Sequence, residues 1–237
     1  MPKSASTTRQ RGSKYLLIGS TEAYSGKSTA VLGMIPQFQQ KGLDIAYGKP
    51  VGTCWEFSHA EGMDEDVKFL AQMLDLPQKQ LLPTLLFLDE ATIQNRMVGE
   101  DRADYGALLA QSLQAPIGDL VLLEGPGTLE EGSVFNLSLL EIADGIDASI
   151  LLVVRFPSLL SVHKLVSAKK RLGDRLLGVL LNDVPSEQWE TVETVVKPFL
   201  EKQDIPVLGV LPRNNLMRSV SVGELVNQLQ AEVLCCK

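Results

Sequence analysis

The stretch at residues 15–29, YLLIGSTEAYSGKST, limits what this chain can fold into more than any other part of its sequence. Its first four residues are apolar and predict a buried strand, and the Gly-Lys-Ser-Thr run at its end predicts the first turn of a helix. Small and polar residues connect the two. A loop in that position can wrap backbone N–H groups around phosphate oxygens, and the helix N-terminus and Lys27 add positive potential. The sequence therefore predicts a strand, an anion-binding loop and a helix in direct succession.

The residue types of this loop indicate how it would hold a nucleotide. Lys27 can reach the outer phosphates, and the Ser28 hydroxyl can ligate Mg²⁺. The other loop residues that we expect to contact the nucleotide are Thr21, Glu22, Ser25, Gly26 and Thr29. The usual pattern has a glycine at the position of Thr21, and the nearest glycine here, Gly19, lies two positions earlier. The alternative is a plain turn with an exposed lysine, but the apolar strand and the helix around the loop favour phosphate binding.

The length and composition fit one α/β domain. A chain of 237 residues with 45% hydrophobic residues can build a sizeable core, and no apolar run approaches the roughly 18 residues of a membrane span. The net charge of −7 argues against general binding to nucleic acid through its phosphates. The three cysteines form no disulfide framework, which favours a reduced, cytoplasmic protein. We expect residues 1–13 to be a disordered basic tail and residues 14–237 to form a single domain.

Apolar strands alternate with helices along the rest of the chain. We expect strands at 15–18, 43–51, 119–124, 148–154, 176–181 and 206–210, and helices at 29–41, 67–76, 105–114, 159–172, 187–203 and 220–230. Residues 85–88 are an apolar run of uncertain type, and Pro36 is expected to kink or shorten its helix. Trp189 and Phe199 are expected on the buried side of the helix at 187–203. This alternation predicts a mostly parallel sheet with helices on both faces.

Ligands of parallel sheets bind beyond the carboxyl ends of the strands. Glu124 ends one predicted strand and is expected to hold Mg²⁺, the alternative being an exposed glutamate before a turn. Lys49 follows another strand and is fixed by Pro50, so a purely solvated charge explains it poorly. A second cation there would stabilise charge that develops in phosphoryl transfer. Arg155 either contacts the ligand or caps the sheet edge.

An acidic cluster, Asp64, Glu65 and Asp66, lies where a polar loop enters a helix. Acids at a helix N-terminus commonly cap it and interact favourably with the helix dipole. Carboxylate oxygens are also suitable ligands for a second Mg²⁺ contact. The residues alone leave both interpretations open.

Five segments in order, STEAYSGKS, YGKPVGT, DEDV, LLEGPGT and VLLND, resemble the dethiobiotin synthetase-like P-loop proteins. That group includes the amidoligases that make cobyrinic acid a,c-diamide. It also includes the N-terminal P-loop domain of long phosphate acetyltransferases and of proteins with a DRTGG domain. The resemblance spans about residues 15–229. It implies a three-layer P-loop NTPase fold that binds ATP and Mg²⁺ and forms a homodimer.

The resemblance also implies roles for residues that match the family motifs. Lys27 and Ser28 would hold the phosphates and Mg²⁺, and Asp66 and Glu124 would complete the metal site. Lys27 would at the same time act in catalysis.

Two further motifs carry substrate and base contacts in the family. Lys49 and Thr53 match the lysine and serine of KPVxSG, which lie near the substrate and the γ-phosphate, so both are expected to be catalytic. Asn182 matches the asparagine that reads the adenine base.

The chain departs from dethiobiotin synthetase in two segments that serve its substrate. The family's Glu-Gly-Ala-Gly-Gly is here Glu-Gly-Pro-Gly-Thr at residues 124–128, and its LGTINH segment is replaced at residues 156–163. By contrast, STEAYSGKS, DEDV, EEGSVFNLS and LPRNNLMRSVSVGEL are more similar to the phosphate acetyltransferase N-terminal type. That resemblance implies a regulatory or sensing module.

Three hypotheses about function follow. The first, which we prefer, is a nucleotide-responsive sensor module that acts through a protein partner. The second is an ATP-dependent ligase or amidoligase that phosphorylates a carbamate or carboxylate, with a small carboxylate or a diamine as substrate. The third is a membrane- or DNA-partitioning ATPase. It is disfavoured because Glu22 stands where those proteins have a signature lysine. We therefore expect neither a nucleic acid nor a membrane as partner.

Overall fold

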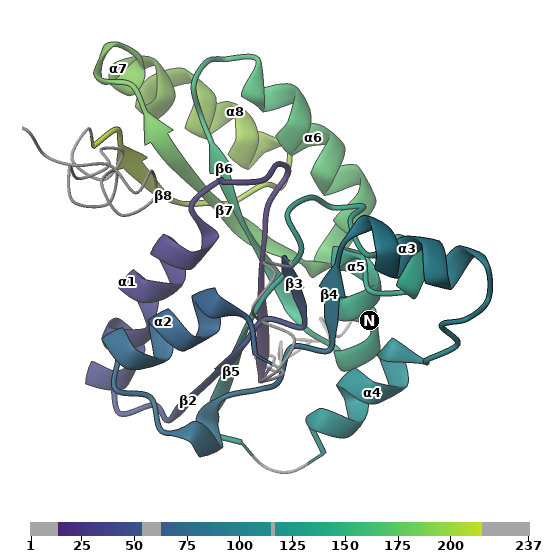
Figure 1. The fold of residues 1–237 in the computed structure, drawn as a ribbon. Coiled ribbons are helices and arrows are strands. Elements are labelled where there is room, and N and C mark those ends of the chain that lie inside the picture. Colours follow the sequence, from purple (N-terminus) through teal and green to yellow (C-terminus); the bar gives the residue numbers. More distant parts are fainter. Residues whose placement is uncertain (1–13, 54–62, 115–116, 215–237) are drawn as a thin grey trace, which may run out of the picture.

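Figure 1 shows the computed structural model, in which residues 14–53, 63–114 and 117–214 are described. Strands β2, β5, β1, β6, β7 and β8 form the main sheet in that order, and every neighbouring pair is parallel. Their bounds are β1 Tyr15–Gly19, β2 Ile45–Gly48, β5 Leu120–Glu124, β6 Ser149–Arg155, β7 Leu176–Val184 and β8 Val207–Pro212. Strands β3 Val51–Thr53 and β4 Leu86–Leu88 form a separate parallel pair. The predicted mostly parallel sheet is confirmed.

Helices cover both faces of the main sheet (Figure 1). The α-helices are α1 Lys27–Gln40, α2 Glu65–Met73, α3 Glu90–Met97, α4 Tyr105–Ser112, α5 Leu139–Ile146, α6 Ser161–Leu172, α7 Trp189–Thr191 and α8 Lys197–Lys202. Short 3₁₀ turns are η2 Gln78–Gln80, η3 Ser133–Phe135, η4 Gly173–Arg175 and η5 Ser186–Gln188, and a π-helical turn, η6, spans Val192–Val196.

The central strand β1 shows how the layers are built. Its alternate side chains point to opposite faces of the sheet. Leu16 and Ile18 belong to the apolar cluster that contains Val31 of α1, whereas Leu17 belongs to the cluster that contains Leu139 of α5. Each such side chain contributes about 1.5–3 kcal/mol through burial. The strand that leads into the predicted loop is therefore fixed by core packing on both sides.

The prediction of one strand over residues 43–51 is wrong. β2 ends at Gly48, and the chain begins β3 after Pro50, where it pairs with β4 instead of the main sheet. Pro50 has no N–H to donate to a strand ladder. Its carbonyl accepts hydrogen bonds from the N–H groups of Leu85 and Leu86. The apolar run of uncertain type is therefore a strand, and Lys49 lies at the break between the two sheets.

Two helical segments also differ from expectation. α1 continues through Pro36 to its end at Gln40, so the expected shortening is wrong. Val31 and Ile35 are fully buried in this helix, and such packing overrides a local helix breaker. α3 was not predicted, because it has no apolar stripe that becomes buried. The Asp89 side chain caps it by accepting a hydrogen bond from the backbone N–H of Thr92 at 2.7 Å.

The predicted helix at residues 187–203 is interrupted by the π turn η6. This turn directly precedes α8, whose Pro198 has no N–H to donate to a helical hydrogen bond. A single π turn of this kind changes the hydrogen-bond pattern of a helix locally. Trp189 and Phe199 are 36% and 44% exposed, so their expected burial is wrong. The buried stripe has a spacing of four residues and consists of Val192, Val196 and Leu200.

The expected tail at 1–13 and the expected helix at 220–230 lie outside the described residues. Among the described residues, none of the helices combines the length and the apolar character needed to cross a membrane.

Candidate functional site

The loop between β1 and α1 is held in place by a glycine and an asparagine. Gly26 caps α1 with φ 97°, a left-handed conformation that favours glycine. A Cβ atom at this position would lie 2.4 Å from Nδ2 of Asn182. The same Nδ2 donates a hydrogen bond to the carbonyl oxygen of Ser25 at 2.9 Å. The end of β7 therefore supports the loop and presents the N-terminus of α1 to the space in front of it.

Lys27 is buried under this loop. Its Nζ donates to Ser20 Oγ at 3.2 Å. Burial lowers the pKa of Lys27, and the negative charge of Glu124 acts against this shift. Ser20 Oγ also lies 2.8 Å from the carbonyl oxygens of Glu22 and Gly127, so it ties the loop to the segment after β5. The lysine is thus fixed at the base of the loop.

Glu124 lies directly across from the loop because the register of the parallel pair sets it beside Ile18. Its Oε1 accepts a hydrogen bond from Ser28 Oγ at 2.8 Å, and its Oε2 accepts one from the Tyr47 hydroxyl at 2.9 Å. Burial raises the pKa of Glu124, while nearby lysines and the two hydroxyl donors act against that shift. Burial and the charge of Glu124 raise the pKa of Tyr47 well above its ordinary value. Tyr47 therefore remains a hydrogen-bond donor.

Lys49 is held by two acids of the predicted acidic cluster. Its Nζ lies 3.0 Å from Asp64 Oδ1 and 2.7 Å from Asp66 Oδ2. Burial works to lower the pKa of Lys49, but the hydrogen bond to Asp66 and the charges of both acids outweigh it and raise the pKa. Asp64 also caps α2 by accepting from the N–H of Asp66 at 2.9 Å. Asp64 is thus a helix cap, whereas the Asp66 side chain is 53% exposed and lines the cavity described next.

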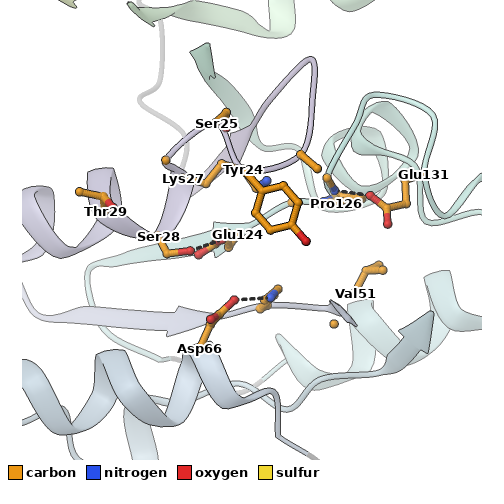
Figure 2. A pocket seen from close by; sticks show the side chains of 16 residues that line it. Tyr24, Ser25, Lys27, Ser28, Thr29, Val51, Asp66, Glu124, Pro126 and Glu131 are labelled. Carbon is orange, nitrogen blue, oxygen red and sulfur yellow. Dashed lines mark hydrogen bonds and ion pairs between the residues drawn. The ribbon is translucent and has the colours of Figure 1, made fainter. Parts of the chain in front are cut away.

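A cavity of about 480 Å³ opens in front of the loop (Figure 2). It collects most of the predicted site residues: Ser25, Gly26, Lys27, Ser28, Thr29, Lys49, Asp66 and Glu124. Tyr24 lines this cavity and a second one of about 520 Å³, which Asn182 and Arg155 also line. The Tyr24 ring is 93% exposed, and its backbone is left-handed with φ 56°. Arg155 lines the second cavity and also forms an ion pair with Asp183 of β7 at 3.1 Å. It therefore lies at the cavity and bonds to the edge of the sheet as well.

The residues of the first cavity fit a phosphate ligand and Mg²⁺. The hydroxyl oxygen of Ser25, which lines this cavity, is buried and has no hydrogen-bond partner among the described residues, so a ligand in the cavity can supply one. Ser28 and Glu124 offer the oxygen atoms that Mg²⁺ prefers. Within residues 14–53, 63–114 and 117–214, no three or more His, Cys, Asp or Glu gather as a metal site. Magnesium would therefore need water or ligand oxygens as well, which suits its chemistry.

The comparisons with known proteins agree with this geometry. A family model described as AAA domain matches residues 14–221. The chain belongs to this family. It is the P-loop family in which dethiobiotin synthetase sits, so the expected P-loop fold is confirmed. The phosphate acetyltransferase of Synechocystis sp. is 27% identical to this AAA-domain chain over 230 residues, which cover 92% of the chain and 32% of that protein. The chain thus spans about a third of the relative's length.

Solved structures show the same fold as this AAA-domain chain. The septum site-determining protein MinD from Pyrococcus horikoshii, complexed with Mg-ADP, has a TM-score of 0.51 at 16% identity and covers 86% of this chain and 83% of its own. A plasmid partition protein from Borrelia burgdorferi bound to AMPPNP has a TM-score of 0.55 at 13% identity, with coverage of 93% and 98%. At these identities the likeness concerns the fold.

Some predicted residues of the AAA-domain chain lie elsewhere. Glu22 forms an ion pair with Lys164 of α6 at 2.5 Å and does not line either cavity. Thr21 lines neither cavity, and its hydroxyl oxygen is buried. The backbone of Thr53 belongs to β3, and its side chain lies outside what the structure describes.

Sequence reasoning missed two residues that touch the site residues directly. Ser20 contacts Lys27, and Tyr47 contacts Glu124. The sequence named Asp64 in the acidic cluster but did not predict its contact with Lys49. Ser20 carries a local signal, since it is a polar residue directly after an apolar strand at the loop. Tyr47 carries none, because an aromatic residue in a strand usually indicates core packing.

Proposed function

We propose that this AAA-domain chain binds MgATP in front of the loop and acts as a nucleotide-responsive regulatory module. The observation that carries the proposal is the arrangement of Lys27, Ser28 and Glu124 at one cavity. The buried, unpartnered hydroxyl of Ser25 on the same cavity adds support, because a bound nucleotide would supply the hydrogen-bond partner that it lacks. The nucleotides named for the structural neighbours, Mg-ADP and AMPPNP, are consistent with the same class of ligand.

The proposal assigns a task to each group of the site. The N–H groups at the start of α1 and the Lys27 ammonium bind the phosphate oxygens. Ser28 and Glu124 hold the metal ion through their oxygens, and Asp66 contributes to the same site. Magnesium, when bound, neutralises the charge of the outer phosphates. Asn182 and the second cavity receive the adenine base.

A regulatory role is preferred over catalysis on account of Lys49. A lysine that stabilises phosphoryl transfer must reach the transferred group, yet Lys49 is engaged by Asp64 and Asp66. The chain is similar to only part of a phosphate acetyltransferase, which supports the same preference. We propose that it responds to nucleotide and acts through a protein partner. In this proposal residues 14–237 form one domain, and residues 1–13 form a basic tail. The module is a homodimer in the cytoplasm.

The second candidate is an ATP-dependent ligase that phosphorylates a carbamate or a carboxylate. It is favoured by the position of Lys49 and Asp66 on the same cavity as Lys27. A small carboxylate or diamine beside the γ-phosphate would meet both side chains, and Thr53 would assist.

Isothermal titration calorimetry with ATP and ADP, with and without Mg²⁺, tests the proposal. Wild-type protein is expected to bind, and Lys27→Ala to bind about 10- to 100-fold more weakly, because a hydrogen bond to a charged group contributes about 1.5–3 kcal/mol. Lys197→Ala, a change on the surface of α8, serves as the control. The absence of wild-type binding would refute nucleotide binding.

Turnover separates the two candidates. Release of ADP that a carboxylate or a diamine stimulates would support the ligase and contradict a purely regulatory module. Binding of ATP with the same slow or absent turnover in the presence of these compounds would support the sensor.

A further inference from the structure

We propose that Tyr47 is a positioning residue that orients the carboxylate of Glu124 for Mg²⁺. This inference rests on the proposed function, because it concerns the metal that accompanies the nucleotide. Tyr47 does not line either cavity in front of the loop, so it acts through Glu124 and not by touching the ligand.

The strand pairing brings the two side chains together. β2 lies beside β5 in parallel register, with Tyr47 opposite Leu122, two residues before Glu124. The Tyr47 ring is fully buried in the apolar cluster that contains Val31 of α1 and Val67 of α2. Packing from both helices therefore fixes the ring, and the ring in turn fixes where its hydroxyl lies.

The Tyr47 hydroxyl binds one carboxylate oxygen of Glu124, and the other carboxylate oxygen is bound by Ser28 of the site. Oε2 accepts from Tyr47 at 2.9 Å, and Oε1 accepts from Ser28 at 2.8 Å. A carboxylate held at both oxygens has one defined orientation, and Figure 2 shows Glu124 beside Ser28 at the cavity. Partners of this kind orient metal ligands and affect metal affinity, typically by about 10- to 100-fold when they are removed.

A competing explanation is that Tyr47 is only a core residue whose hydroxyl needs an acceptor. The two explanations differ in what loss of the hydroxyl changes. A purely structural hydroxyl would affect the stability of the fold. A positioning hydroxyl would affect how much Mg²⁺ is needed to strengthen nucleotide binding.

Tyr47→Phe removes the hydroxyl and leaves the ring in place. We would titrate Mg²⁺ into protein with a fluorescent ADP analogue and record the Mg²⁺ concentration at half-maximal effect. The expected result is an increase of about tenfold for Tyr47→Phe, with unchanged affinity for the analogue in EDTA. Tyr105→Phe is the matched control, since it removes a hydroxyl that donates to a carboxylate of Asp101 away from the site. It should leave the Mg²⁺ dependence unchanged.

A double-mutant cycle with Glu124→Gln shows whether Tyr47 acts through Glu124. In the Glu124→Gln background, Tyr47→Phe should have no further effect on the Mg²⁺ dependence. Additive effects would overturn the proposal, and so would a wild-type Mg²⁺ dependence in Tyr47→Phe or a Tyr47→Phe chain that fails to fold. Failure of the proposed function gives a different result, because wild-type protein would then bind no analogue at all.

Discussion

Ser28 and Glu124 are 96 positions apart in the sequence, yet the hydroxyl of one lies 2.8 Å from Oε1 of the other. This contact follows from the parallel register of β1 and β5, which sets Ile18 beside Glu124. The loop after one strand and the acid that ends the other therefore meet at the same edge of the sheet. Their hydroxyl and carboxylate oxygens are the groups that we propose for Mg²⁺.

Replacing Ser28 by alanine is expected to remove the effect of Mg²⁺ on nucleotide binding. The loop N–H groups and Lys27 remain, so the affinity for ADP in EDTA should stay within about twofold, a difference of less than 1 kcal/mol. Calorimetry with and without Mg²⁺ measures both quantities. Ser112→Ala, which removes a hydroxyl bonded to a backbone carbonyl in α4, is the control. If Mg²⁺ still strengthens binding to Ser28→Ala as in wild type, Ser28 is not a metal ligand.

Gly26→Ala is expected to destabilise the fold and disturb the loop. The left-handed backbone and the close approach to Asn182 both oppose a Cβ atom at this position, and the cost should be about 1–3 kcal/mol. Gly33→Ala is the opposite case, since it lies within α1 and has open space around it. There alanine should stabilise by about 0.5–1 kcal/mol. Urea unfolding of both variants measures the difference, and equal effects would contradict the proposed role of Gly26.

Asp64→Asn is expected to lower the free energy of unfolding strongly. Asp64 is a buried partner of Lys49 and the cap of α2. Because Lys49 keeps its ion pair with Asp66, the cost should be that of one hydrogen bond between charged groups, about 1.5–3 kcal/mol. Glu65→Gln, an exposed change in the first turn of the same helix, should cost less than about 1 kcal/mol. Similar unfolding midpoints for the two variants would show that the contact between Asp64 and Lys49 contributes little.

The pKa of Glu124 gives a prediction about pH. Because burial raises this pKa above its ordinary value of 4.5, the folded chain binds a proton at Glu124 more tightly than the unfolded chain. The stability that this carboxyl contributes is therefore fully present below pH 4.5 and falls as pH rises toward the folded-state pKa. Glu124→Gln has no such loss. Its stability relative to wild type should increase from pH 4.5 to neutral pH, as measured by urea unfolding at several pH values. A constant difference across this range would contradict the raised pKa.

Much of the fold and part of the site could be predicted because their signals are local. The apolar residues before the loop and the Gly-Lys-Ser run at its end predicted β1 and α1. The strand ends predicted that Glu124 and Lys49 lie at the same edge of the sheet, and both line the first cavity. Pairing between distant segments has no such signal. Nothing in the residues near Lys49 predicts that Leu85 and Leu86 bind the carbonyl of Pro50 and so divide the sheet.

Side-chain contacts across the core were harder still to predict. Tyr47 and Glu124 meet only because β2 occupies the edge beside β5, a strand order that the sequence does not state. Trp189 and Phe199 were misplaced because the π turn before Pro198 changes which residues of that segment face inward. Both cases depend on packing between segments rather than on residue type.

The hydrogen bond from Asn182 to the carbonyl of Ser25 ties the end of β7 to the loop before α1. Gly26, the next residue along, lines both cavities, so this contact lies at the wall that separates them. Any displacement of this segment would therefore change the shape of both cavities at once.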